Sequence, residues 1–390
     1  MELGFERIKR ATFGAVDVAF NGAIEFSRFT KKQIEFNKLN PDGVRVNYEK
    51  SLATSSVVID FYSNTEEFSS KIKTFVSTGQ TKCYVDLLVD GKLFAHDGYD
   101  GDHDGQINFD LRLPKGEKRI ALYLCNLFKC EIESISISDG ATFSVATGEK
   151  YLFIGDSITQ GYTSVYPSNS YVNATARALN AHAFNQSIGG AFFNADTLDA
   201  DIGFIPDKVI IAYGTNDWNK RDDLFIRAEE FCARLTKLFD KSQIIAVTPI
   251  WRGDIENIEK IKGVKFFDMQ KRLKEIFMKF PKIRVVDGVD LVPHKKECFI
   301  ADVLHPNDLG FKEYSKNLIK KLKGEGKMEE KKEQVVETEQ KTEQTESGLV
   351  GGLKSLFKKV KTTLGKVDAA LEKVNDKEDF KSEEKADENK

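Results

Sequence analysis

From residue 151 onward, short apolar runs alternate with longer segments in which apolar residues recur about every 3.6 positions. The apolar runs predict strands over residues 151–154, 209–213, 244–247 and 283–286. The periodic segments predict helices over residues 171–179, 222–239, 264–280 and 308–322. Strands that alternate with helices of this length favour an α/β fold with a parallel, doubly wound sheet and right-handed crossovers. The loops at the carboxyl ends of its strands would then border one crevice.

Four short blocks stand at the ends of these runs or before the last helix. They are Gly155-Asp156-Ser157, Asn185-Gln186-Ser187-Ile188-Gly189-Gly190, Gly214-Thr215-Asn216-Asp217 and Asp302-Val303-Leu304-His305-Pro306. Gly155 stands two positions before Ser157, but Thr159 stands two positions after it, so the first block is not a Gly-x-Ser-x-Gly elbow. Alone, that block is also typical of a turn or a helix cap. Together the four resemble the SGNH (GDSL-type) hydrolase family, over about residues 151–322.

The resemblance implies a flavodoxin-like sheet (the SGNH hydrolase fold) and a serine esterase that needs no cofactor. Ser157 would be the nucleophile, and His305 the base that removes its proton. If residues 302–305 make one helical turn, Asp302 shares a face with His305 and can orient its ring. Asp302 could instead be only a helix cap.

The same resemblance implies donors for the oxyanion that forms during attack. They are the backbone N–H groups of Ser157 and Gly190 and the side-chain amide of Asn216. Gly189 is the rival of Gly190, which is preferred for its spacing from Asn185.

Other polar and aromatic residues in or near these blocks have less defined roles. Asp156 and Asp217 are expected to brace their loops by hydrogen bonds rather than to react. Tyr162, Trp218 and Trp251 could line the acyl or sugar pocket, or could pack in the core.

Residues 12–145 have a β-like pattern. Strands are predicted over residues 44–48, 57–62, 72–76, 84–89, 92–94, 121–124 and 132–137. Asp90-Gly91 predicts a two-residue hairpin. Many short strands favour an all-β sandwich of jelly-roll type. Some SGNH enzymes that act on acylated sugars carry a similar domain, which favours short-chain, acetyl esters of carbohydrate as substrates. The domain could also only pack on the catalytic domain.

Within this region, Asp100, Asp102 and Asp104 alternate in a loop that ends in glycine, a pattern typical of calcium sites. Leu111 stands where an EF-hand would need glutamate, so a full site of that type is excluded. The alternatives are a weak structural calcium site and a solvated hairpin tip.

Net charge, hydropathy and cysteine content bear on the binding partners and the cellular compartment of the protein. The net charge of −3 gives no reason to expect nucleic-acid binding. The N-terminus lacks a basic start followed by an apolar run, and no stretch is apolar enough to span a bilayer. The five cysteines show no paired metal spacing. These features predict a cytoplasmic protein with reduced thiols.

The pattern divides the chain into a β-sandwich domain (1–147), a catalytic domain (148–324), a disordered charged linker (325–347), an amphipathic basic helix (348–376) and a disordered tail (377–390). Residues 349–374 could bind an anionic membrane surface or a partner helix, or stay solvated. The alternatives to a carbohydrate esterase are a lipid esterase or thioesterase that this helix recruits to membranes, and a catalytically idle binding protein.

Overall fold

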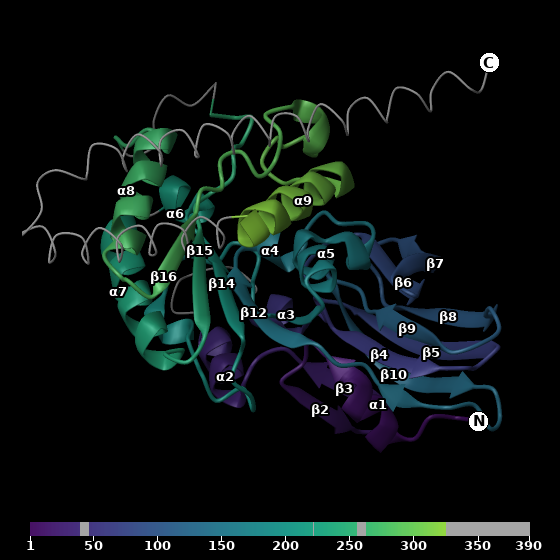
Figure 1. The fold of residues 1–390 in the computed structure, drawn as a ribbon. Helices are drawn as coiled ribbons and strands as arrows, with labels where there is room; N and C mark the ends of the chain where they lie inside the picture. The colour runs from purple at the N-terminus through teal and green to yellow at the C-terminus, as the bar shows by residue number, and fades with distance from the viewer. Residues whose placement is uncertain (40–46, 221, 256–262, 325–390) are drawn as a thin grey trace, which may run out of the picture. The chain divides into compact units, whose positions relative to one another are not determined.

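The structure is a computed structural model that describes residues 1–39, 47–220, 222–255 and 263–324. Met1–Leu322 form one compact unit (Figure 1). The predicted linker, amphipathic helix and tail lie outside the described residues, and the division at residues 147/148 stays a prediction. None of the helices in the described ranges has the length and apolar composition needed to cross a bilayer.

Two antiparallel sheets form the N-terminal part. The first has the order β1 (Thr12–Phe13), β4 (Val58–Ser63), β9 (Lys118–Tyr123), β6 (Lys82–Val89) and β7 (Lys92–Asp100), with β11 (Ser144–Val145) also paired to β4. The second has the order β2 (Asp17–Phe20), β3 (Ile24–Ser27), β10 (Phe128–Ile137), β5 (Glu67–Val76) and β8 (Gly105–Arg112). Their inner faces share one hydrophobic core, to which Phe61 and Leu122 contribute from the first sheet and Phe68 and Ile132 from the second. This is a sandwich; its jelly-roll assignment stays a prediction.

The β6–β7 hairpin turns where the sequence predicts, because Asp90 and Gly91 both have positive φ, at 50° and 75°. Residues 44–46 of the predicted strand over residues 44–48 lie outside the described ranges, and its end is wrong, because Asn47 and Tyr48 open helix α3 (Asn47–Leu52). The carbonyl of Lys50 in this helix accepts hydrogen bonds from side chains elsewhere in the fold, so tertiary contacts outweigh the local β pattern. Two further helices are α1 (Phe5–Ala11) and α2 (Lys31–Leu39).

A third sheet is entirely parallel, as the sequence predicts. Its order is β13 (Ala181–Asn185), β12 (Glu149–Gly155), β14 (Lys208–Ala212), β15 (Gln243–Val247) and β16 (Ile283–Val286). In chain order this is 2-1-3-4-5, the flavodoxin-like arrangement, whose switch point lies between β12 and β14. The loops after these two neighbouring strands therefore start side by side.

Helices cover both faces of this sheet (Figure 1). Alternate β12 residues explain the two layers: Leu152 and Ile154 pack with α7 (Leu224–Leu238) and α8 (Phe266–Met278), and Tyr151 and Phe153 pack with α5 (Tyr171–Ala178) and α9 (Asp308–Gly324). The shorter elements are α4 (Ser157–Gln160), α6 (Thr215–Lys220), and the 3-10 turns η1 (Pro167–Asn169), η2 (Ala195–Thr197) and η3 (Lys296–Cys298). All five cysteines lie in the described ranges, are buried and form no disulfide.

Candidate active site

Ser157 is the first residue of α4, directly beyond the end of β12. At Gly155 a Cβ would lie 2.7 Å from the carbonyl oxygen of Ala212, so only glycine allows β12 and β14 to pair this closely at their ends. Asp156 caps the short helix by accepting the amide of Ile158 at 3.0 Å. Ser157 is 8% exposed, and its own N–H has no acceptor within the helix.

Three side chains form a continuous hydrogen-bonded relay. Ser157 Oγ lies 2.8 Å from His305 Nε2, and His305 Nδ1 lies 2.6 Å from Asp302 Oδ2. Asp302 Oδ1 also accepts the amides of Leu304 and His305, each at 2.9 Å. Burial opposes ionisation of Asp302, but the bonds from the His305 ring and from these amides outweigh it and lower the pKa of the carboxyl to about 2.

The stretch that joins Asp302 to His305 is not the helical turn on which the prediction depended. Val303 has φ of 49°, a conformation that β-branched residues rarely adopt. The turn is fixed instead by the two amides that Asp302 accepts and by the bond from Gly253 N to Val303 O at 2.7 Å. Asp302 therefore both caps the turn and holds the imidazole.

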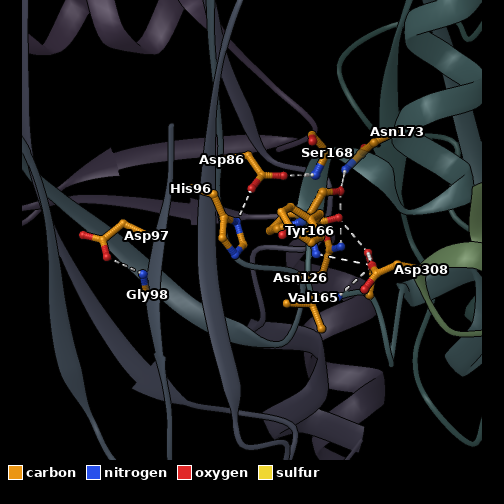
Figure 2. Close-up of polar contacts among 12 residues, drawn as sticks. Asp86, His96, Asp97, Gly98, Asn126, Val165, Tyr166, Ser168, Asn173 and Asp308 are labelled. Carbon is orange, nitrogen blue, oxygen red and sulfur yellow. Dashed lines mark hydrogen bonds and ion pairs between the residues drawn. The ribbon is translucent and has the colours of Figure 1, made fainter. Parts of the chain in front are cut away.

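The loop after α4 is bonded to the start of α9, three residues after His305. Asp308, at the start of α9, accepts the amides of Val165 and Tyr166 at 3.1 and 3.4 Å (Figure 2). Further along this loop, the buried Asp86 of β6 accepts the amide of Ser168 at 2.9 Å, and its other oxygen lies 2.7 Å from His96 Nδ1. The sandwich thus fixes a loop that in turn holds the segment following His305.

The glycine block lies beside Ser157. A Cβ placed on Gly189 would lie 3.5 Å from Ser157 Cβ. The amide of Gly189 donates to Gln160 Oε1 at 2.7 Å, whereas the amide of Gly190 has no hydrogen-bond partner in the described part of the chain. Gly190 has φ of 89°, which favours glycine at this position. The geometry thus leaves the N–H of Gly190 available and that of Gly189 engaged.

The third block follows β14, next to the end of β12. Asn216 Nδ2 donates to Ala191 O at 3.1 Å, and the amide has a second hydrogen left for another acceptor. Asp217 Oδ1 accepts the amide of Phe193 at 3.0 Å, so it braces the segment after the glycine block. Burial raises the pKa of Asp217 to about 7 and that of Asp156 to about 6.

Two cations of the N-terminal part reach this site, and neither was predicted from the sequence. Arg28 is 1% exposed and donates to the carbonyls of Asn185, Ser187, Lys50 and Ala53. Lys50 Nζ donates to Gly189 O at 2.8 Å. No motif marks either residue, because a lone arginine or lysine in a sequence most often lies on a solvated surface.

Of the three aromatic residues considered for substrate binding, the structure brings Tyr162 beside the relay. Its ring centroid lies 4.9 Å from that of His305. Trp218 and Trp251 are 2% and 6% exposed and belong to the two hydrophobic layers of the parallel sheet, so the alternative of core packing fits their positions.

Two of the three aspartates of the predicted calcium loop have partners. Asp100 accepts from Lys82 Nζ and Tyr84 Oη, both at 2.8 Å, and Asp104 accepts the amide of Val76 at 2.8 Å. Among the described residues, no group of three or more His, Cys, Asp or Glu side chains is arranged to hold a metal ion. Calcium binding by a loop that includes Asp102 stays a prediction.

Comparisons with known proteins agree with this geometry. The model of the GDSL-like lipase/acylhydrolase family matches residues 153–312, and no curated protein matches the chain. A similar solved structure is the salicylyl-acyltransferase SsfX3 from a tetracycline biosynthetic pathway, with 18% identity, a TM-score of 0.64 and coverage of 81% of this chain and 94% of that one. A protein from Bacteroides ovatus described as a GDSL-like lipase has 16% identity, a TM-score of 0.61 and coverage of 82% and 95%.

A family two carbohydrate esterase from Clostridium thermocellum, solved with cellohexaose, has 16% identity, a TM-score of 0.53 and coverage of 70% and 93%. At these identities the likeness is one of fold. The coverage by the first two structures extends well beyond the family match, so it includes the N-terminal sheets as well as the parallel one. Residues 153–312 thus match the GDSL-like lipase/acylhydrolase family, and this match supports an ester hydrolase.

Proposed function

We propose that the protein is a serine esterase in which Ser157 attacks the acyl carbon and His305 and Asp302 assist. The observation that carries the proposal is the relay from Ser157 Oγ through the His305 ring to Asp302. A hydroxyl is a weak nucleophile, and an imidazole within hydrogen-bond distance can remove its proton during attack. The ionised Asp302 keeps a proton on Nδ1, so that Nε2 faces the serine as an acceptor, and it stabilises the imidazolium that forms.

The reaction then follows in two balanced halves. Ser157 Oγ bonds to the acyl carbon while its proton passes to His305, and the imidazolium gives that proton to the departing alcohol. Water next attacks the acyl-enzyme with His305 as base, which releases the acid and restores the serine. In both halves the negative oxygen would accept from the N–H groups of Ser157 and Gly190 and from the Asn216 amide. The hydrogen bonds of the block support this set, because the Gly190 N–H is unengaged in the described part of the chain and Gly189, the residue before it, lies beside Ser157.

For the substrate we propose short-chain, acetyl esters of carbohydrate. The support is the sandwich that precedes the catalytic domain together with the fold likeness to a carbohydrate esterase solved with a cello-oligosaccharide. Hydrolysis of lipid esters or thioesters is the alternative, and it would depend on residues 349–374, which lie outside the described ranges. A binding protein without activity is the second alternative, and the assembled relay argues against it.

The proposal is tested with p-nitrophenyl acetate and a fluorophosphonate probe. We expect the wild-type protein to turn over the ester and to take up one phosphonyl group at Ser157, located by peptide mass spectrometry. Ser157→Ala should lose both properties and melt near the wild-type temperature, because the change removes one oxygen. Turnover by Ser157→Ala at the wild-type rate would contradict the assignment of the nucleophile.

The substrate class needs a second comparison. The kcat/KM for release of acetate from acetylated xylo- and cello-oligosaccharides should exceed the kcat/KM for hydrolysis of p-nitrophenyl decanoate. A preference for the decanoyl ester would instead favour the lipid alternative. Adding a simple alcohol as acceptor would show whether the acyl group passes to alcohols as well as to water.

A further inference from the structure

The outer edge of strand β13 and the segment after it is covered by cations from the N-terminal part. The guanidinium of Arg28 donates to the carbonyls of Asn185 and Ser187, and Lys50 Nζ donates to the carbonyl of Gly189. Three alternate carbonyls on one edge thus each meet a positive charge. Asn185 and Ser187 lie two apart where the segment continues the strand, so their carbonyls point to the same side, and Gly189 opens the turn that follows. The three carbonyls form a row that ends at this turn.

The opposite edge of the same segment is held by β12. The amides of Gln186 and Ile188 donate to Phe153 O and Gly155 O at 2.8 and 3.2 Å. The glycine block is therefore fixed from two sides, by the parallel sheet and by the N-terminal cations. A loop held in this way can present a backbone amide in a defined direction.

The peptide unit that joins Gly189 to Gly190 lies at the end of this row. In a trans peptide the C=O and the following N–H point in opposite directions. Because Lys50 holds the Gly189 oxygen, the Gly190 N–H points away from the ammonium. The amide of Gly189 is separately fixed by Gln160 Oε1 at 2.7 Å, and Gln160 Nε2 donates in turn to Lys50 O at 3.2 Å.

We propose that Lys50 is a positioning residue for the oxyanion hole, an inference that rests on the proposed esterase function. Its ammonium fixes the plane of the Gly189–Gly190 peptide. It also polarises that peptide, since hydrogen bonds in a chain strengthen one another, and so makes the Gly190 N–H a stronger donor. Lys50 acts through this peptide and does not itself touch the reacting atoms. The N-terminal part of the chain is thereby a component of the catalytic site.

The test compares Lys50→Met with Lys38→Met, a matched change at an exposed lysine of α2 whose partner is Glu35. We expect Lys50→Met to lower kcat for p-nitrophenyl acetate about 10- to 100-fold, less than the hundred- to thousandfold typical when a donor is removed outright. KM should change little. Affinity for phenylboronic acid, whose adduct with Ser157 places a negative oxygen in the hole, should fall by a similar factor. Lys50→Arg should restore much of both, and Lys38→Met should match the wild type.

A purely structural role for Lys50 predicts a different result. It would lower the melting temperature and the active fraction, but would leave kcat per labelled serine and boronate affinity unchanged, and that outcome overturns the inference. If Lys50→Met does not fold, Lys50→Gln carries the same comparison with a neutral polar side chain. A wild-type protein that neither hydrolyses the ester nor takes up fluorophosphonate at Ser157 would refute the esterase itself, whereas an active wild type with an unaffected Lys50→Met refutes only the role of Lys50.

Discussion

Ser157 Oγ lies 2.8 Å from His305 Nε2, although 148 residues separate the two in the chain. The parallel sheet explains how they meet. Ser157 leaves the end of β12, the first strand of the sheet, whereas His305 precedes α9, the last helix, which packs back onto β12 through Phe153 and its neighbours. The contact therefore depends on the packing of α9 against the parallel sheet, so any loss of that packing should separate the pair.

Asp302→Asn should lower kcat by about a thousandfold or more, because an amide can no longer hold the proton on His305 Nδ1 and the ring loses the orientation that faces the serine. KM and the melting temperature should change little. Since the pKa of Asp302 is about 2, the carboxylate is ionised throughout the range above pH 4, so the loss should be seen both at pH 6 and at pH 8. Steady-state kinetics at both values checks this.

Asp110→Asn, a matched change at an exposed position of β8, should leave kcat unaltered. A loss of less than tenfold in Asp302→Asn would mean that the carboxylate only caps the turn. In that case the role of Asp302 is limited to accepting the amides of Leu304 and His305. An asparagine oxygen can accept the same two bonds.

Strands, helices and blocks with a strong local signal were predictable from the sequence. The periodicity located β14 to β16 and α7 to α9, and the four blocks located Ser157 and His305. The positive φ of Val303 was not predictable, because β-branched residues disfavour it and only the surrounding contacts enforce it. The roles of Arg28 and Lys50 were not predictable either, because both side chains donate to carbonyls that are far away in the chain.

Arg28→Met should destabilise the protein by about 3 kcal/mol, although it removes a buried charge. Burial lowers the pKa of Arg28 to about 9, which shows that the guanidinium is costly to bury. Methionine would relieve that cost, but the carbonyls of Ala53, Asn185 and Ser187 would lose the donor that Arg28 supplies, at about 1–3 kcal/mol each. The Lys50 carbonyl would keep its bond from Gln160. The carbonyls outweigh the desolvation. Urea unfolding of the variant measures the difference.

Two further variants serve as controls for the stability of Arg28→Met. Arg10→Met, at an exposed position of α1, should change the free energy of unfolding by less than about 0.5 kcal/mol. Arg28→Lys should be intermediate, because an ammonium keeps the charge but cannot reach all four acceptors at once. Equal stability of Arg28→Met and the wild type would show that desolvation dominates after all.

Asp217→Asn should stabilise the protein at alkaline pH and not at acid pH. Burial raises the pKa of Asp217 in the folded state to about 7, from 3.8 as the ordinary value. Between these values the unfolded chain has released the proton and the folded chain retains it, so the wild type loses stability as the pH rises through this window. Asparagine keeps the oxygen that accepts the Phe193 amide and removes the charge. The variant should therefore melt several degrees above the wild type at pH 8 and near it at pH 4; a constant difference would contradict the buried-charge explanation.

Tyr162 links the relay to the sandwich, because its ring lies near that of His305 and also packs against the core of the N-terminal sheets. Tyr162→Ala should lower kcat about tenfold for every ester, since a cavity beside His305 loosens the imidazole. Tyr162→Phe keeps the ring and should retain kcat. If the phenol also binds sugar, Tyr162→Phe should raise KM for acetylated xylo-oligosaccharides and leave KM for p-nitrophenyl acetate unchanged. Kinetics of both variants on both substrates separates the two roles, and an equal KM for the sugar ester in Tyr162→Phe and wild type would limit Tyr162 to packing.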